Sequence, residues 1–194
     1  FAVRAQENTY QHLLAAKDDT AKVMQLFRYG KKSFRNDTAQ SRKLNREIIR
    51  ISEKINFPYG GGIAAMDIAY SYVIVGGNEV QAIANYRKAL AYLKKTDSTE
   101  MIAKCLLNIA NCVEATDSYT EAVNVTLEAV RILENTPYKG MLARAYGSLG
   151  LTFYNIDNHP KALEYLKKAL PITREIKDTG RLLVVLYGLS ATLS

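Results

Sequence analysis

The sequence predicts an all-α solenoid of stacked helix pairs, on the basis of three observations. Residues 101–130 align without a gap to residues 141–170 when the chain is shifted by 40 positions. Within each copy, apolar residues recur at helical spacing, in two runs that each fit one helix. Small residues occupy matching positions in both copies. A unit of this kind buries its apolar face only against its neighbours, so the copies should stack.

We expect about nine or ten helices. Residues 1–17 form a lead-in with a short helix near 7–16, and the repeat array spans 18–194. Four helix pairs and one unpaired helix make up the array, at 18–57, 58–97, 98–137, 138–178 and 179–194. The individual helices are predicted at 18–35, 38–55, 62–75, 79–95, 99–115, 119–134, 141–155, 159–176 and 180–193. Because the last helix lacks a partner, we expect the natural protein to continue beyond Ser194.

The phrase Asn-x-Pro-Tyr-x-Gly occurs twice, with Pro58 and Pro137 separated by 79 residues, which is two periods less one residue. We interpret it as the link between helix pairs, because proline disfavours helix in the residue before it. On this interpretation Gly60–Gly62 form a flexible turn. A phosphate-binding loop is the alternative, but neither a preceding strand nor a following Lys-Ser/Thr supports it.

Three segments resemble capping boxes at helix starts, namely Asn78–Gln81, Asp97–Glu100 and Ser118–Glu121. Pro160 suits a first helical turn, whereas Pro171 predicts a kink or an early end to the helix at 159–176.

The fourth repeat carries the strongest family signal, in Leu149-Gly150, Phe153, Ala162, Tyr165 and Ala169. These residues resemble the tetratricopeptide repeat motif, although the period of 40 exceeds the usual 34. The resemblance implies a right-handed α-α superhelix that binds proteins. Long-period arrays with phrases such as that at 52–65 look like the sensory or partner-binding region of bacterial signal-transduction proteins.

The family's register also implies a concave groove, lined by the first helix of each pair, that takes a protein or peptide. The groove residues carried over from the motif are Tyr72, Lys104, Asn108, Asn111, Glu114, Arg144, Leu151, Tyr154 and Asn155. A clamp for a peptide's terminal carboxylate, known in a subfamily, is not supported, since Ile68, Tyr72 and Ser148 occupy three of its five positions.

The net charge of +7 is concentrated at one end, because residues 1–57 hold 12 Lys and Arg against 6 Asp and Glu. Arg42, Lys43, Arg46 and Arg50 form a basic stripe at helical spacing in the first repeat. The stripe is either a solvated face or a docking site for an acidic partner or anionic lipid. Because the rest of the chain is nearly neutral, nucleic acid is not expected as a partner.

The sequence offers little for catalysis. Cys105 and Cys112 lie seven residues apart in one helix, too far to pair with each other, and are expected to be buried thiols. His12 and His159, the two histidines, have no nucleophile placed beside them by a motif. We therefore expect no enzyme activity, no cofactor and no metal site.

No apolar run is long enough to span a bilayer. Val3-Arg4-Ala5 fits a small-x-small signal-peptidase site, which favours an exported, periplasmic protein, while an arbitrary chain boundary at Phe1 would leave a cytoplasmic one. The chief rival to groove binding is self-association through the apolar last helix, around Leu182, Leu183, Val185, Leu186 and Leu189.

Overall fold

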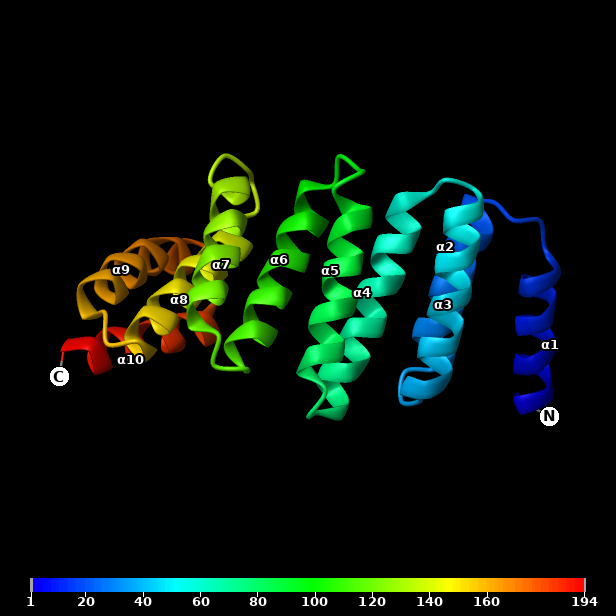
Figure 1. The fold of residues 1–194 in the computed structure, drawn as a ribbon, viewed down its shortest axis with the longest axis horizontal. Coiled ribbons are helices and arrows are strands. Elements are labelled where there is room, and N and C mark those ends of the chain that lie inside the picture. Colours follow the sequence, from blue (N-terminus) through cyan, green and yellow to red (C-terminus); the bar gives the residue numbers. More distant parts are fainter. Residues whose placement is uncertain (1, 194) are drawn as a thin grey trace. The chain divides into compact units, whose positions relative to one another are not determined.

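The computed structural model is built from helices alone in the part that it describes, which is the backbone of residues 2–193 and the side chains of residues 8–193 (Figure 1). The ten helices of this part confirm the predicted fold class and number. Their bounds are α1 Ala2–Ala15, α2 Thr20–Ser33, α3 Thr38–Lys54, α4 Pro58–Val75, α5 Glu79–Leu93, α6 Thr99–Glu114, α7 Tyr119–Leu133, α8 Lys139–Asn155, α9 His159–Glu175 and α10 Thr179–Leu193. The predicted cleavage signal at Val3–Ala5 lies outside the described side chains.

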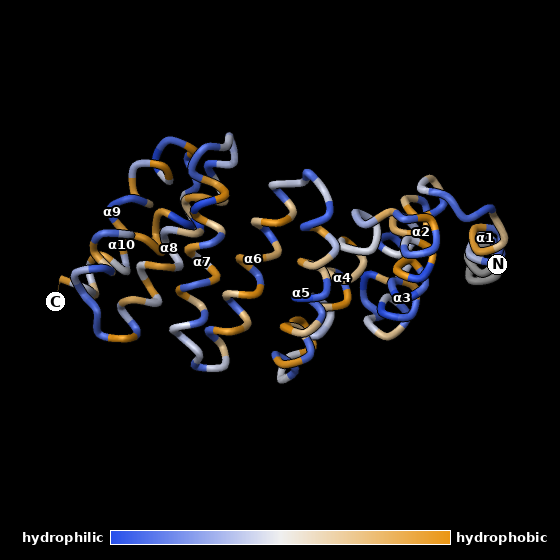
Figure 2. The backbone as a smooth tube through the Cα atoms, turned by 45° about the horizontal axis from the view of Figure 1, so that its top comes forward, coloured by the Kyte–Doolittle hydropathy of each residue, from blue (hydrophilic) through white to orange (hydrophobic). Residues whose placement is uncertain are grey.

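The helices divide into two units, Phe1–Asp97 with α1 to α5 and Ser98–Ser194 with α6 to α10. In the first unit each helix packs on its neighbour in sequence, and α4 lies between α3 and α5. Because two helices cover α4, it is apolar on nearly all sides, and most of its residues from Gly60 to Ser71 are buried. Figure 2 shows hydrophobic and hydrophilic stretches alternating along the other helices.

In the second unit α6 pairs with α7, α8 with α9, and α10 packs against both α8 and α9. Six alanines stand where the second helix of each pair crosses its partner, and all are buried as their spacing predicts. They are Ala82, Ala89, Ala122, Ala129, Ala162 and Ala169. Asp117 and Asp157, which the repeat aligns, both have φ of 56° just after α6 and α8. A short polar side chain tolerates this left-handed conformation, so the aligned aspartates mark one shared turn.

The interpretation of Gly60–Gly62 as a flexible turn is wrong, because α4 begins at Pro58 and all three glycines are buried within it. Neighbouring side chains leave no room for a Cβ atom. One at Gly60 would lie 2.6 Å from Ser52 Oγ, and one at Gly62 would lie 2.7 Å from Leu93 Cδ2. The glycines therefore let α4 approach its neighbours, which outweighs their low helix propensity.

The predicted capping boxes do not form, since Asn78, Ser98 and Ser118 stand at helix N-caps without a side-chain capping hydrogen bond. Capping is instead provided by Asp19, Asp37 and Asn158, whose side chains accept from the backbone N–H three residues later. Pro160 lies in the first turn of α9 as predicted. Pro171 does not end this helix, which continues to Glu175.

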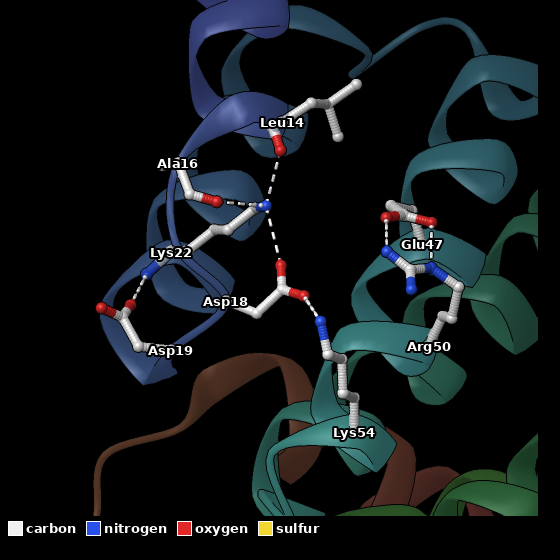
Figure 3. Close-up of polar contacts among 8 residues, drawn as sticks. All are labelled: Leu14, Ala16, Asp18, Asp19, Lys22, Glu47, Arg50 and Lys54. Atoms are coloured by element: carbon white, nitrogen blue, oxygen red, sulfur yellow. Dashed lines mark hydrogen bonds and ion pairs between the residues drawn. The ribbon is translucent and has the colours of Figure 1, made fainter.

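A buried lysine joins α1 to the repeats (Figure 3). The Lys22 ammonium group donates to the carbonyl oxygens of Leu14 at 2.6 Å and Ala16 at 2.8 Å, and to Asp18 at 2.9 Å. Asp18 also accepts from Lys54 of α3 at 2.6 Å. These two lysines lower the pKa of Asp18 to about 2, chiefly through the hydrogen bond from Lys54. Lys22 thus holds the end of α1, and Asp18 ties the link after α1 to both α2 and α3.

Candidate functional site

The predicted groove residues of the second unit meet between α6 and α8. Arg144 donates to the side-chain oxygen of Asn108 at 3.1 Å and to the Leu107 carbonyl oxygen at 3.5 Å. With its amide oriented to satisfy both neighbours, Asn111 donates to that carbonyl oxygen at 3.1 Å and accepts from Arg144 at 2.9 Å. These three predicted groove residues therefore lie together between α6 and α8, where they bond to one another.

A second set of predicted residues bridges the same two helices nearer their C-terminal ends. Glu114 accepts hydrogen bonds from Thr152 at 3.1 Å and from Asn155 at 3.3 Å. Since Thr152 is buried, this carboxylate is partly committed to holding α8 against α6. The helices that carry the groove are thus fixed by polar contacts at two levels.

The groove opens into a cavity of about 580 Å³ over the N-terminal halves of α6 and α8. Four cationic side chains, one carboxylate and several apolar side chains line it. The residues are Glu100, Lys104, Pro137, Tyr138, Lys139, Gly140, Met141, Arg144, Ile176 and Arg181. Of these, only Lys104 and Arg144 are predicted groove residues.

A second cavity, of about 270 Å³, shares Arg144 and Arg181 with the first. Gly147, Ser148, Leu151, Val184 and Val185 complete its lining. The predicted groove residue Leu151 therefore lies in an apolar extension of the basic cavity. Together the two cavities, which we call the basic groove, run along α6, α8 and α10 within one unit.

The cations of the basic groove differ in how they are held. Lys104 is exposed and has no ion pair among the described residues. Arg181 pairs with Asp178 at 3.1 Å, and Lys139 pairs with Glu175. The Lys139–Glu175 pair is exposed, whereas the Arg181–Asp178 pair is half-buried. Exposed pairs contribute little to stability, so a partner's carboxylate can replace Glu175 at small cost. The groove therefore keeps an excess of positive charge.

Sequence reasoning missed Lys139 and Arg181. Arg181 follows Met141 by one repeat and Met101 by two, so a basic residue replaces a repeated methionine there. That break in the repeat was an available signal. Lys139 had no comparable signal, because it lies in the phrase that we interpreted as the link between helix pairs.

Six of the nine predicted groove residues do not line the basic groove. Four of them, Asn108, Asn111, Glu114 and Asn155, bond within the contact between α6 and α8 described above. The other two lie elsewhere. Tyr72 belongs to α4 in the first unit, where the Arg42 guanidinium stacks over its ring at 5.0 Å. Tyr154 packs against the His159 ring at the α8–α9 turn, with centroids 5.7 Å apart. Neither side chain lines the basic groove.

The four residues of the predicted basic stripe on α3 differ in their contacts. Arg50 forms a two-point pair with Glu47, at 2.9 and 2.6 Å, which lowers the pKa of the Glu47 carboxyl (Figure 3). Arg42 turns toward α4 and also donates to Ser71 at 3.3 Å. Lys43 and Arg46 are exposed. The stripe thus does not present four equivalent charges.

Cys105 and Cys112 are buried as predicted, and burial raises the pKa of the Cys105 thiol to about 12. Among the described residues, no group of three or more His, Cys, Asp or Glu side chains is placed to hold a metal ion. None of the described helices combines the length and hydropathy of a membrane span.

Comparison with known proteins places these observations in a family. A family model described as "Tetratricopeptide repeat" matches residues 101–175, which include most of the basic groove. Solved structures of tetratricopeptide repeat proteins match helices well beyond this segment. Residues 101–175 therefore contain tetratricopeptide repeats, and the rest of the chain shares the fold of such proteins. No curated protein sequence matches it.

Three solved structures show how far the tetratricopeptide fold extends along the chain. BtubC from P. vanneervenii is 16% identical with a TM-score of 0.77, over 99% of this chain and 83% of that one. Aspartyl phosphate phosphatase F from Bacillus subtilis is 19% identical with a TM-score of 0.84, over 100% and 51%. A signal transduction ATPase with a tetratricopeptide repeat sensor, from Pyrococcus horikoshii, is 18% identical with a TM-score of 0.75, over 96% and 30%. The chain thus spans about half of the phosphatase and less than a third of the ATPase.

Proposed function

We propose that the second unit binds an acidic, extended segment of a partner protein in the basic groove. The fold is that of a protein-binding scaffold, and such repeats are generally non-catalytic. The observation that carries the finer proposal is the charge of the 580 Å³ cavity, whose lining holds four cations and one carboxylate. Carboxylates of a partner would be attracted to this surface and would orient on Lys104 and Arg181.

The apolar part of the groove indicates what else the partner carries. Met141 and Ile176 line the basic cavity, and Leu151 and Val184 line the extension beside it. Extended peptides obtain affinity from backbone hydrogen bonds and specificity from pockets for alternate side chains. A segment that alternates acidic and large apolar side chains therefore matches this lining in both charge and hydropathy.

We further propose that the chain is the sensory or partner-binding part of a longer bacterial signalling protein and has no catalytic role of its own. The likeness to the sensor-bearing ATPase supports this role, since that chain carries its repeats beside other domains. The likeness to the aspartyl phosphate phosphatase is of fold only, at 19% identity.

The test uses two fluorescein-labelled peptides, one alternating Glu and Leu and the other alternating Lys and Leu, with binding followed by fluorescence anisotropy. We expect only the acidic peptide to bind, and more weakly as salt rises. Lys104→Glu should weaken binding of the acidic peptide by on the order of tenfold, since the substitution reverses an unpaired charge at the groove. Lys167→Glu makes the same charge change on an exposed position of α9 outside the groove and should have little effect. Equal weakening by both variants would show that only net charge matters and would refute the site.

Self-association through α10 is a second candidate. Leu183, Leu186 and Tyr187 are exposed on this helix. Val185, which the sequence also assigned to the self-association surface, is buried. Sedimentation velocity tests the idea. A dimer that Leu183→Glu converts to a monomer supports it, and a wild-type monomer at tens of micromolar excludes it.

A further inference from the structure

A cavity of about 340 Å³ lies in the first unit between α2, α3 and α4, separate from the basic groove. Six apolar side chains line it, namely Phe27, Phe34, Leu44, Ile48, Tyr70 and Ile74, together with Gly30 and seven polar or charged residues. Its size falls at the lower end of the range for small-molecule sites, about 300–1,000 Å³. Its lining combines large apolar side chains with polar groups that can orient a ligand, as small-molecule sites do.

The repeat shows that this space is an opening in a core that the later repeats fill. Tyr70 and Ile74 occupy the positions of Leu149 and Phe153 in α8. Leu149 and Phe153 are at most 5% exposed, whereas Tyr70 is 56% and Ile74 is 51% exposed. Two core positions of α4 are thus left exposed, and both line the cavity. Large apolar side chains at such positions favour an apolar guest.

The walls are held in place before any guest binds. Phe34 packs edge-on against Tyr29 and Tyr10, whose rings stack with centroids 5.4 Å apart. At Gly30 the chain approaches α3 closely, since a Cβ atom there would lie 2.6 Å from Leu44 Cδ2. A cavity with fixed walls loses little conformational entropy on binding.

The charges of the lining indicate an anionic guest. Lys31 bonds to Asp67 at 2.8 Å, so these two charges largely cancel. Arg35 also lines the cavity, is exposed, and has no ion pair among the described residues. A guanidinium group binds a carboxylate through two parallel hydrogen bonds. Asn45 adds a buried amide to the lining.

We propose that this cavity binds a small amphiphilic carboxylate, whose apolar body lies among Phe27, Phe34 and Ile74 and whose carboxylate pairs with Arg35. The site would give the chain a small-molecule input that is independent of the peptide groove of the second unit.

The test uses the aromatic anion 8-anilinonaphthalene-1-sulfonate as a fluorescent reporter and decanoate as its competitor. We expect one saturable site on the intact chain, from which decanoate displaces the dye and decylamine does so at least about tenfold less well. Arg35→Glu should weaken dye binding by at least about tenfold, because it places a like charge beside the anion. Arg28→Glu is the matched control on an exposed position of α2 outside the cavity.

Ile74→Glu tests the apolar wall at a position exposed enough to tolerate the change, and Val80→Glu is its control on an exposed position of α5 outside the cavity. Loss of dye binding in Ile74→Glu but not in Val80→Glu would support the site. Unchanged binding in Ile74→Glu, or equal competition by decylamine, would overturn it. The proposal also fails if neither small anion binds and Ile74→Glu instead weakens the acidic peptide, since the cavity would then receive a partner's side chain.

Discussion

Gly150 of α8 lies in direct contact with Leu166 of α9. A Cβ atom at Gly150 would lie 2.5 Å from Leu166 Cγ and 2.8 Å from its Cδ2, and Leu166 is fully buried. We expect Gly150→Ala to lower the free energy of unfolding by about 1–2 kcal/mol, because the overpacking outweighs the gain in helix propensity. Urea unfolding measures this loss.

Gly180→Ala is the control for that substitution. Gly180 lies in the first turn of α10, where the nearest atom to an added Cβ is 3.7 Å away. Its replacement should be neutral or stabilise by up to about 1 kcal/mol. If Gly150→Ala behaved in the same way, close approach of α8 and α9 would not be the reason for glycine there.

Lys22→Met should loosen α1 from the repeats. The variant keeps the length of the side chain but removes the donor that serves Leu14, Ala16 and Asp18. We expect a loss of about 1–3 kcal/mol, the usual cost of leaving buried polar groups unpaired. Hydrogen exchange should report faster exchange in α1, while the exposed Lys17→Met leaves it unchanged. Equal exchange rates in the two variants would contradict this role for Lys22.

The Asp18 carboxyl should make stability depend on pH in acid. Its pKa in the folded chain is about 2, below its ordinary value of 3.8, so the unfolded chain takes up this proton at higher pH than the folded chain does. The stabilisation is therefore complete above about pH 4 and is lost as the pH falls toward 2.

Asp18→Asn removes that titration. The gap in melting temperature between wild type and this variant should narrow as the pH falls from 4 to 2, measured at low salt. Asp97→Asn, at an exposed carboxylate, serves as the control. A gap that stays constant over this range would mean that Asp18 is not the group responsible.

The helix pairs were predictable from the sequence because they depend on short-range patterns. Apolar spacing locates each helix, and the alanines locate the crossings. Gly60–Gly62 were not predictable in this way, since three glycines normally argue against helix. Their reason lies in Ser52 and Leu93, which come from other helices. Contacts between distant segments of the chain decide such positions, and one repeat does not reveal them.

The sequence predicted a binding groove between neighbouring helices, and that role stays a prediction. The family motif assigned Asn108, Asn111 and Arg144 to two helices that the structure shows in contact. It could not show that these groups satisfy one another, because hydrogen bonding depends on side-chain geometry. The cavity of the first unit was also missed, since the same motif assigns Tyr70 to the core.

Arg144 should therefore have two roles that Lys104 does not share. Arg144→Met keeps the aliphatic contacts but leaves Asn108 and Asn111 without their shared donor, so we expect a loss of stability of about 1 kcal/mol. It should also weaken the acidic peptide, whereas Lys104→Glu should weaken the peptide with stability changed by less than about 0.5 kcal/mol. Arg174→Met, on an exposed position of α9, is the control for loss of an arginine. Chemical unfolding and peptide anisotropy on the same samples separate the roles, and an Arg144→Met variant as stable as wild type would show that the network does not hold α8 on α6.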